Sequence, residues 1–467
     1  MKKIQDQLRI LLINAIDIDS EIERRYPNLG LGYLAASVRR RFPDIDIQFR
    51  IADSNIPHIL QSFKPHLAGI TTVSQNFQIA QNHMDILSKH SLPTVWGGIH
   101  ISTLPHLLPY EAVAACIGES EETFADVVRC FIDDGLSTTS LGQVPGVAFR
   151  NQGKIQITNN REPIADIDTI SMPARDLLPI RKHTYMFTSR GCPYQCTFCS
   201  SSRYWGKTRF FSAEYVVDEI EYLWKTYHVS MISFFDDLFI AKRSRLEEMI
   251  RLMERRNLLG KIQFTCNSRA NLIDDEMARL LSRLGVVSSG FGMESGDEET
   301  LRYLKCTNIS VNQNQAAINT MKKAGIAVNA SFIIGSPNES RKSIMRTYDF
   351  IRNSKLDLFD VYILTPFPGT PVWDYAKQRG IVSEDDFDWS RLSVNVYRNP
   401  EKAIILSETL SKEEIIGLYK RLKRLRLLRS VIRVWNHPLR KDVPRYIWAR
   451  TVEFIMDSLC KKRSSFQ

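Results

Sequence analysis

Three cysteines stand close together in the run from Thr188 to Ser200, at Cys192, Cys196 and Cys199. Their spacing is C-x3-C-x2-C, and the nearest other cysteines, Cys130 and Cys266, are far away in the sequence. Three thiolates at this spacing can bind three irons of a 4Fe–4S cluster and leave the fourth iron without a protein ligand. Such an iron is open to a substrate or cofactor, so the run predicts a catalytic cluster and not a sealed electron-transfer centre.

Two simpler uses of these cysteines fit less well. A structural zinc ion normally takes four protein ligands, and the fourth is missing here. A disulfide framework is not expected, because eight cysteines are sparse for 467 residues and the N-terminus runs without a signal peptide into a strand-like stretch. We therefore expect a reducing compartment and a cytoplasmic protein.

Other polar or glycine clusters follow apolar, strand-like runs farther along the chain. Taken singly, each is as easily a helix cap or a turn as part of a site. Taken together with the cysteine run they predict a cofactor pocket. These clusters are Asp236 and Asp237, Asn267–Arg269, Met293–Gly296, Gly335–Glu339 and Thr365–Pro371.

The elements that would position these residues alternate between strand and helix from residue 181 to about 398. Six units of this kind predict a partial (β/α)6 barrel, with its chemistry at the carboxyl ends of the strands. The cysteine run follows the first strand, where that rule places an active site. The expected strands are 184–189, 230–236, 262–267, 286–293, 327–334 and 359–365.

Residues 1–140 show the same alternation and predict a doubly wound, Rossmann-like α/β domain with a parallel sheet. Residues 141–180 read as a linker that contains a β-hairpin, and residues 399–467 as a basic helical region. The expected N-terminal strands are 8–14, 45–51, 67–73, 94–96 and 114–117, with helices at 29–41 and 79–90.

The cysteine run and the strand-end clusters resemble the radical S-adenosylmethionine (SAM) superfamily over about residues 184–380. The resemblance implies that Cys192, Cys196 and Cys199 bind the cluster and that its free iron chelates SAM. It further implies that Asp236 or Asp237 holds the SAM amino group and Arg269 its carboxylate. Glu294 would bind the ribose hydroxyls, and the segment Gly335–Glu339 would lie beside the adenine.

The N-terminal domain resembles the cobalamin-binding group within that superfamily, and the run Pro173–Asp176 in the linker agrees. The similarity implies a bound cobalamin. Cobalamin proteins with the D-x-H-x-x-G motif ligate cobalt through its histidine, but here Arg25 and Pro27 stand at the Asp and His positions when Gly30 is aligned. The cobalamin would thus be base-off without a protein histidine; the alternative is a flavodoxin-like domain that has lost its ligand. The implied binding residues are Gly30, Thr71, Thr72, Gly97, Gly98, Gly118 and Glu119. From its position just after Gly97 and Gly98, His100 is expected at the rim of the pocket, where it either contacts cobalamin or the substrate or is an incidental loop histidine.

The resemblance implies a radical enzyme that cleaves SAM reductively, with electrons from a flavodoxin- or ferredoxin-type donor, and methylates an unactivated carbon of a small-molecule or lipid-like substrate. Two alternatives stay open. One is a cobalamin-associated radical rearrangement, cyclisation or oxidation without methyl transfer. The other is a binding module that senses cobalamin or the cluster.

The net charge of +10 is concentrated at the C-terminal end. Residues 411–467 hold 15 Lys or Arg against 5 Asp or Glu, an excess equal to the charge of the whole chain. The rest is near neutral, so no nucleic-acid partner is expected. Leu422, Leu425 and Leu428 can form one helical stripe among these basic residues. Such a helix either packs back on the barrel or makes peripheral contact with an anionic membrane.

Overall fold

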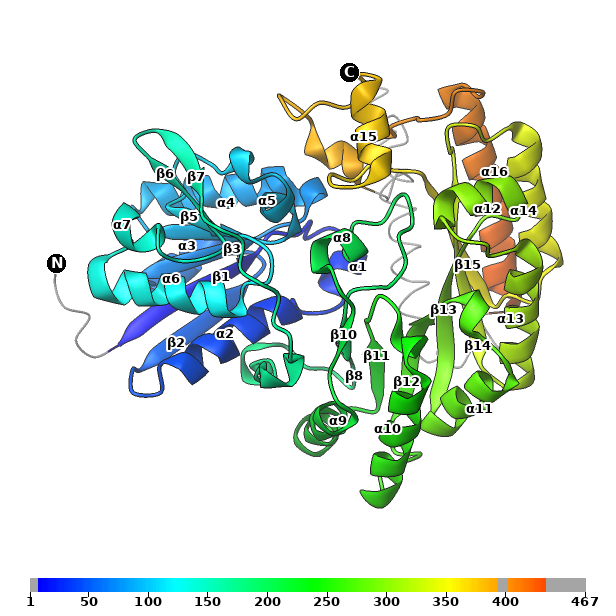
Figure 1. The fold of residues 1–467 in the computed structure, drawn as a ribbon, viewed down its shortest axis with the longest axis horizontal. Coiled ribbons are helices and arrows are strands. Elements are labelled where there is room, and N and C mark those ends of the chain that lie inside the picture. Colours follow the sequence, from blue (N-terminus) through cyan, green and yellow to red (C-terminus); the bar gives the residue numbers. More distant parts are fainter. Residues whose placement is uncertain (1–6, 394–401, 434–467) are drawn as a thin grey trace.

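The chain forms two α/β units that lie side by side in a computed structural model, which describes residues 7–393 and 402–433 (Figure 1). Blue and cyan elements form the N-terminal unit, and green to yellow elements form the second. Of the basic region expected from residue 399 onward, residues 399–401 and 434–467 lie outside the described part of the chain.

The N-terminal sheet has seven strands in the order β2-β1-β3-β4-β5-β6-β7. Strands β1 to β5 are parallel, which confirms the expected doubly wound domain. The hairpin that we expected within the linker instead extends this sheet, because β6 pairs antiparallel with β5. The strands are β1 (Leu8–Asn14), β2 (Ile47–Ala52), β3 (Leu67–Thr71), β4 (Thr94–Gly97), β5 (Ala114–Cys116), β6 (Val147–Asn151) and β7 (Lys154–Ile157).

Helices cover both faces of this sheet, so strand β1 is buried almost throughout and is apolar without alternation. Apolar residues of α2 and α6 form the core on one face, and those of α3 and α4 form the core on the other. The side chain of Asn28 caps α2 by accepting a hydrogen bond from Leu31 N. The helices are α1 (Glu21–Arg24), α2 (Leu29–Arg41), α3 (Ile56–Phe63), α4 (Phe77–Lys89), α5 (Ile99–Thr103), α6 (Glu121–Asp134) and α7 (Thr138–Leu141).

The second unit contains a six-stranded parallel sheet in the order β15-β14-β13-β12-β11-β8. This arrangement confirms the six βα units of a partial barrel, with β8 and β15 at its two edges. The strands are β8 (His183–Met186), β11 (Met231–Phe234), β12 (Gln263–Ser268), β13 (Val286–Glu294), β14 (Ala327–Ile334) and β15 (Leu358–Ile363). The helices are α9 (Ala213–Tyr227), α10 (Arg243–Arg255), α11 (Asp275–Leu284), α12 (Glu298–Lys305), α13 (Val311–Lys323) and α14 (Arg341–Asn353).

The loop that carries the three cysteines is closed at its base by a short antiparallel ribbon. Its strands are β9 (Ser189–Arg190) and β10 (Arg209–Phe210), and Arg190 is paired with Arg209. Helix α8 (Ser201–Trp205) lies within this loop, between the two units (Figure 1).

Two segments join the units. In the connector, Arg175 is fully buried and pairs with Glu219 of α9 at 2.6 Å. After the barrel, α15 (Pro371–Gln378) and a 3₁₀ turn at Trp389–Leu392 pack on the N-terminal unit. We call residues 365–392 the strap. The rings of Trp373 and Trp389 stack, and Trp389 also contacts Phe77 of α4.

Helix α16 (Lys412–Arg433) packs back on the barrel, where it contacts β15 and α14. Arg426 donates to Phe359 O at 2.9 Å, and Arg429 donates to carbonyls at the end of α14. The expected leucine stripe is wrong in part, because Leu422 is buried but Leu428 is 65 % exposed. Within the described residues no helix combines the length and apolar character of a membrane span.

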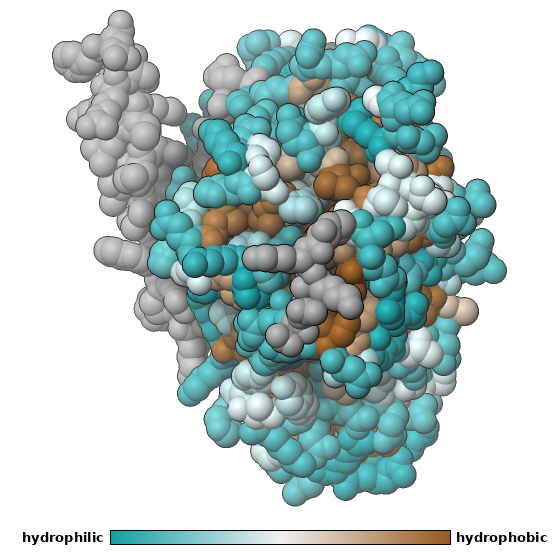
Figure 2. Space-filling view, turned by 90° about the vertical axis from the view of Figure 1, so that its left-hand side faces the viewer, coloured by the Kyte–Doolittle hydropathy of each residue, from teal (hydrophilic) through white to brown (hydrophobic). Residues whose placement is uncertain are grey.

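The face of the N-terminal unit that points away from the barrel is mostly hydrophilic, with hydrophobic residues showing only in small patches (Figure 2). The apolar side chains of the N-terminal unit lie in its interior and against the strap. One core cluster there includes residues of both units. The two units are therefore packed as one body with shared apolar contacts.

Candidate functional site

A cavity of about 2030 Å³ lies against the inner face of the barrel sheet. Its wall combines the cysteine loop, the strand ends of the barrel and residues next to α1. It brings together side chains from three of the five expected clusters, at Asp237, Asn267–Arg269 and Glu294, whereas the clusters Gly335–Glu339 and Thr365–Pro371 do not line it. The cysteines and the polar residues near them in the barrel part of the wall are Cys192, Cys196, Cys199, Asp237, Asn267, Ser268, Arg269, Glu294 and Lys305.

The three cysteines reach this cavity from the loop after β8. Cys196 is buried, and Cys192 and Cys199 are half-buried. Burial raises the pKa of Cys192, and it raises that of Cys199 to about 11, so these thiols give up their protons readily only when a metal binds. Within the described residues no three metal-binding side chains are close enough to share one ion, whereas a 4Fe–4S cube needs each thiolate to bind a separate iron.

The paired carboxylates after β11 have different surroundings. Asp236 is buried and accepts hydrogen bonds from Thr188 N at 2.6 Å and from Ser189 Oγ at 2.8 Å, so it holds the start of the cysteine loop. Asp237 lines the cavity and accepts a hydrogen bond from Ser201 Oγ. Burial raises the pKa of the Asp237 carboxyl. A cation bound in the cavity would lower this pKa, because it stabilises the charged carboxylate.

Arg269 is buried in the cavity wall beside the cysteines. Its Nη1 lies 3.6 Å from Cys196 Sγ, its Nη2 donates to Thr307 Oγ1 at 2.7 Å, and its guanidinium stacks on Tyr194 at 3.7 Å. The buried Nε has no hydrogen-bond partner in the described structure. A guanidinium with a donor left over in an enclosed wall suits a carboxylate ligand.

Glu294 ends β13 in a left-handed conformation, with φ at +58°. Its carboxylate forms a buried ion pair with Lys305 at 2.9 Å and folds over Gly292, where a Cβ would lie 2.3 Å from Glu294 Oε1. A larger residue at position 292 would therefore require the Glu294 carboxylate to move. A strained residue held by its surroundings is a frequent mark of a functional site. Lys305 was missed by the sequence reasoning, because nothing in α12 distinguishes it from a surface lysine.

Gly335 and Glu339 lie after β14 but outside the described cavity wall. Glu339 accepts hydrogen bonds from Gly335 N at 2.7 Å and from Ser336 N at 3.2 Å, so it shapes this turn. Burial raises the pKa of Glu339 to about 8. The role of this segment beside an adenine stays a prediction.

The residues expected to bind cobalamin gather at the carboxyl end of the N-terminal sheet. Gly98 has φ at +96°, and a Cβ there would lie 2.5 Å from Thr72 O. A Cβ at Gly97 or Gly118 would meet open space, so both leave room for a ligand at the strand ends. Thr71 is half-exposed beside them, whereas the Thr72 hydroxyl is used internally, on Val73 O. We call these strand ends, with Gly118, the cradle.

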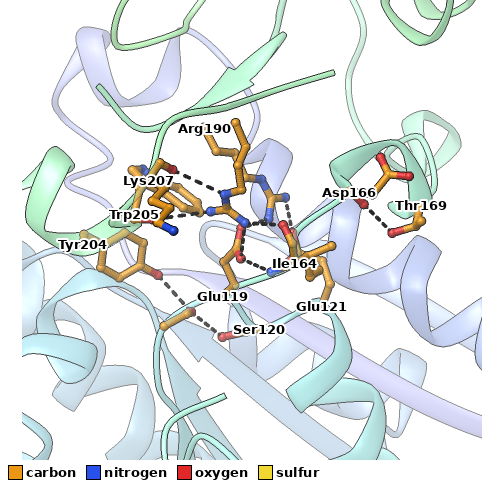
Figure 3. Close-up of polar contacts among 12 residues, drawn as sticks. Glu119, Ser120, Glu121, Ile164, Asp166, Thr169, Arg190, Tyr204, Trp205 and Lys207 are labelled. Atoms are coloured by element: carbon orange, nitrogen blue, oxygen red, sulfur yellow. Dashed lines mark hydrogen bonds and ion pairs between the residues drawn. The ribbon is translucent and has the colours of Figure 1, made fainter. Parts of the chain in front are cut away.

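Three neighbouring residues have other surroundings. Gly30 is exposed in the first turn of α2. Glu119 is engaged by Arg190 and Arg209, as Figure 3 shows for Arg190. The expectation that His100 lies at a pocket rim is wrong, since His100 is 0 % exposed and its ring packs against Phe77 and Trp389.

The residues present fit the three expected groups. Three cysteines share one wall, Asp237 and the unpartnered Arg269 Nε match the ammonium and carboxylate of an amino acid, and the cradle leaves space at Gly97 and Gly118. The residues at the D-x-H positions are Arg25, which lines the cavity, and Pro27, whose backbone oxygen accepts a hydrogen bond from Tyr185. Neither side chain is an imidazole, so neither takes the place of the histidine in that motif.

Comparison with known proteins agrees with this geometry. The sequence model of the radical SAM superfamily matches residues 186–351, and that of the B12 binding domain matches residues 17–128. An uncharacterized methyltransferase of Pyrococcus horikoshii is 33 % identical over 368 residues, which cover 75 % of this chain and 78 % of that protein. The anaerobic magnesium-protoporphyrin IX monomethyl ester cyclase of Cereibacter sphaeroides is 24 % identical over 425 residues, covering 86 % of this chain and 68 % of that protein.

Among solved structures, the radical SAM methyltransferase TsrM of Kitasatospora setae aligns with a TM-score of 0.67 at 17 % identity, over 80 % of this chain and 77 % of that one. The cobalamin-dependent radical SAM enzyme OxsB aligns with a TM-score of 0.61 at 18 % identity, over 90 % of this chain and 61 % of that one. These two likenesses establish the fold. With the family matches and the cysteine loop, they lead to one conclusion: the chain belongs to the radical SAM superfamily, in the group whose members carry an N-terminal B12-binding domain.

Proposed function

We propose that this enzyme is a cobalamin-dependent radical SAM methyltransferase that acts on an unactivated carbon of a small-molecule substrate. The observation that carries the proposal is the attachment of the cysteine loop to both units. The loop lines the barrel cavity through its cysteines, and the Tyr204 hydroxyl of the same loop donates to Gly118 O in the cradle at 2.9 Å. A methyl donor in the cradle and a radical source in the cavity would then serve one substrate.

When bound, the cluster with SAM supplies a carbon-centred radical that removes hydrogen, and cobalamin supplies the methyl group. The chain's own residues bind and orient. Asp237 would hold the SAM ammonium, and Arg269 would present Nε to its carboxylate. Glu294, fixed by Lys305, would accept from the ribose hydroxyls.

The cavity wall carries more cations than carboxylates, with eight Lys or Arg side chains against five Asp or Glu. Four of these cations, Arg24, Arg25, Arg181 and Lys182, have no ion-pair partner among the described residues. We expect the substrate to carry an acidic group that these side chains attract. A substrate search therefore starts with carboxylated and phosphorylated compounds; methylation of neutral compounds alone would contradict this expectation.

The direct test uses SAM with a deuterated methyl group. After anaerobic reconstitution with iron, sulfide and hydroxocobalamin, the protein is reduced with titanium citrate and given labelled SAM. Mass spectrometry should recover the labelled methyl on the protein-bound cobalamin, even without a substrate. Retained cobalamin that never acquires the label would refute methyl transfer.

Retained cobalamin without the labelled methyl group would favour the alternative of radical cyclisation, rearrangement or oxidation. One specific observation supports it, namely the similarity over 86 % of this chain to a protein named as a cyclase. The electron source in either case would be a one-electron donor of the flavodoxin or ferredoxin type. Membrane contact through the basic C-terminal region remains an expectation, since much of that region lies outside the described residues.

A further inference from the structure

Arg190, the residue directly before Gly191 and Cys192, points toward Glu119 and Glu121 of the N-terminal unit (Figure 3) and is not among the residues that line the cavity. Its Nη1 lies 2.6 Å from Glu119 Oε1, and its Nη2 pairs with Glu121. The side chains of Arg190 and Glu119 are only 7 % and 8 % exposed. A charge removed from water in this way must be placed with good geometry, because a misplaced partner leaves it uncompensated.

Arg209 repeats the contact from the other end of the cysteine loop. Its Nη1 lies 2.7 Å from Glu119 Oε2 and also donates to Ile164 O at 2.6 Å. Because Arg190 and Arg209 are paired in the β9–β10 ribbon, one carboxylate holds both ends of the loop that contains the cysteines. We call Glu119, Glu121, Arg190 and Arg209 the clasp.

On the other side, the clasp adjoins the cradle. Glu119 and Glu121 follow Gly118, and Gly118 O accepts from the Tyr204 hydroxyl of α8. The turn after β5 is therefore held by the cysteine loop at three points, through Arg190, Arg209 and Tyr204. A shift of the turn toward or away from a ligand at Gly118 would move the base of the cysteine loop with it.

We infer that Arg190 is a positioning residue and that the clasp couples the cradle to the cysteine loop, so that filling either site favours the bound geometry of the other. The inference rests on the use of both cofactors but not on methyl transfer itself. Coupling of this kind is reciprocal, because each ligand must change the affinity of the other by the same factor.

The test measures cobalamin affinity by ultrafiltration under anaerobic conditions, in protein with and without a reconstituted cluster. In the unmodified protein we expect the cluster to tighten hydroxocobalamin binding by roughly fivefold or more. In Arg190→Met the two affinities should become equal, and Arg190→Lys should restore part of the difference. Glu121→Gln keeps an oxygen acceptor and provides a milder variant should Arg190→Met fail to fold.

The matched control is Asp357→Asn, which disrupts an Asp–Lys ion pair with Lys322 that lies wholly within the barrel, at 2.8 Å. This variant should lower stability yet keep the full effect of the cluster on cobalamin affinity. Equal affinities in the unmodified protein, or an undiminished effect in both Arg190→Met and Glu121→Gln, would overturn the inference. An unmodified protein that binds no cobalamin would overturn this inference and the proposed function together, whereas coupled binding without methyl transfer would overturn only the latter.

Discussion

Asp236 and Asp237 are adjacent and chemically identical, but their different surroundings give them different roles. The carboxylate of Asp236 accepts hydrogen bonds from Thr188 N and Ser189 Oγ and lies near the guanidinium of Arg245. The carboxylate of Asp237 lines the cavity. A carboxylate without its own protein cation is the one available to a ligand ammonium.

Asp237→Asn should therefore weaken SAM binding by about 10- to 100-fold, the loss expected for a hydrogen bond to a charged group. Equilibrium binding of labelled SAM to cluster-loaded protein measures this effect, and the melting temperature should change little. Asp236→Asn is the comparison: it should lower the melting temperature, because it loosens a buried network. The reverse pattern would assign the ligand role to Asp236.

A third carboxyl, Glu339, predicts a pH dependence of stability. Burial raises the pKa of Glu339 from its ordinary value of 4.5 to about 8. Between these pH values only the folded state holds the proton, so this group lowers the free energy of unfolding by about 1.4 kcal/mol for each unit of rising pH. Its favourable contribution is complete below pH 4.5 and lost above pH 8.

Glu339→Gln keeps an oxygen for the Gly335 and Ser336 amides but removes the titration. Urea unfolding of cofactor-free protein at pH 5, 6.5 and 8 should show the variant gaining stability relative to the parent as the pH rises. Parallel curves for the two proteins would mean that Glu339 ionises normally in the fold.

At the scale of elements, the strap connects the barrel to the N-terminal unit and packs there against α4. Trp389 stacks on Trp373 with ring centroids 5.9 Å apart and meets the His100 ring at 4.7 Å. Burial lowers the pKa of His100 to about 4, so this histidine stays neutral inside the aromatic cluster. The cluster uses His100 for packing and leaves it unsuited to ligand binding at a rim.

Trp389→Ala should lower the free energy of unfolding by about 3–5 kcal/mol, as expected for truncating a buried tryptophan. Denaturant unfolding followed by circular dichroism measures the change. Tyr110→Ala supplies the control, because Tyr110 is 76 % exposed on the N-terminal unit and should change stability by no more than about 0.5 kcal/mol. Similar small effects of both changes would show that the strap is not part of the core.

The elements themselves were predictable to within a few residues. Strands such as β1 and β14 are buried on both faces, so they appear in the sequence as apolar runs with helical patterns between them. The hairpin was also recognised, but its partner was not, because pairing of β6 with β5 depends on tertiary placement. The exposed Leu428 shows the same limit, since the face of α16 that packs is set by the barrel.

At the scale of the molecule, what the sequence could not predict lies mostly between the units. The cysteines, Arg269 and Glu294 follow strand ends and were identified in advance, and the structure brings them to one cavity. The clasp and the buried pair of Arg175 with Glu219 depend on residues far apart in the chain, whereas Lys305 lies only 11 residues from its partner Glu294 and has the sequence surroundings of a surface lysine. No local pattern marks such pairs, because an arginine that crosses between units has the same neighbours in sequence as one on the surface.

The whole molecule thus places a cysteine loop between a barrel cavity and a cradle, and every proposed step depends on that loop binding a cluster that cleaves SAM. The most direct measurement is 5′-deoxyadenosine formed from SAM by the reduced, reconstituted protein, compared with the variant Cys196→Ala prepared in the same way. We predict 5′-deoxyadenosine from the unmodified protein and none from the variant. No product from the unmodified protein despite a complete cluster, or equal product from both, would contradict the account.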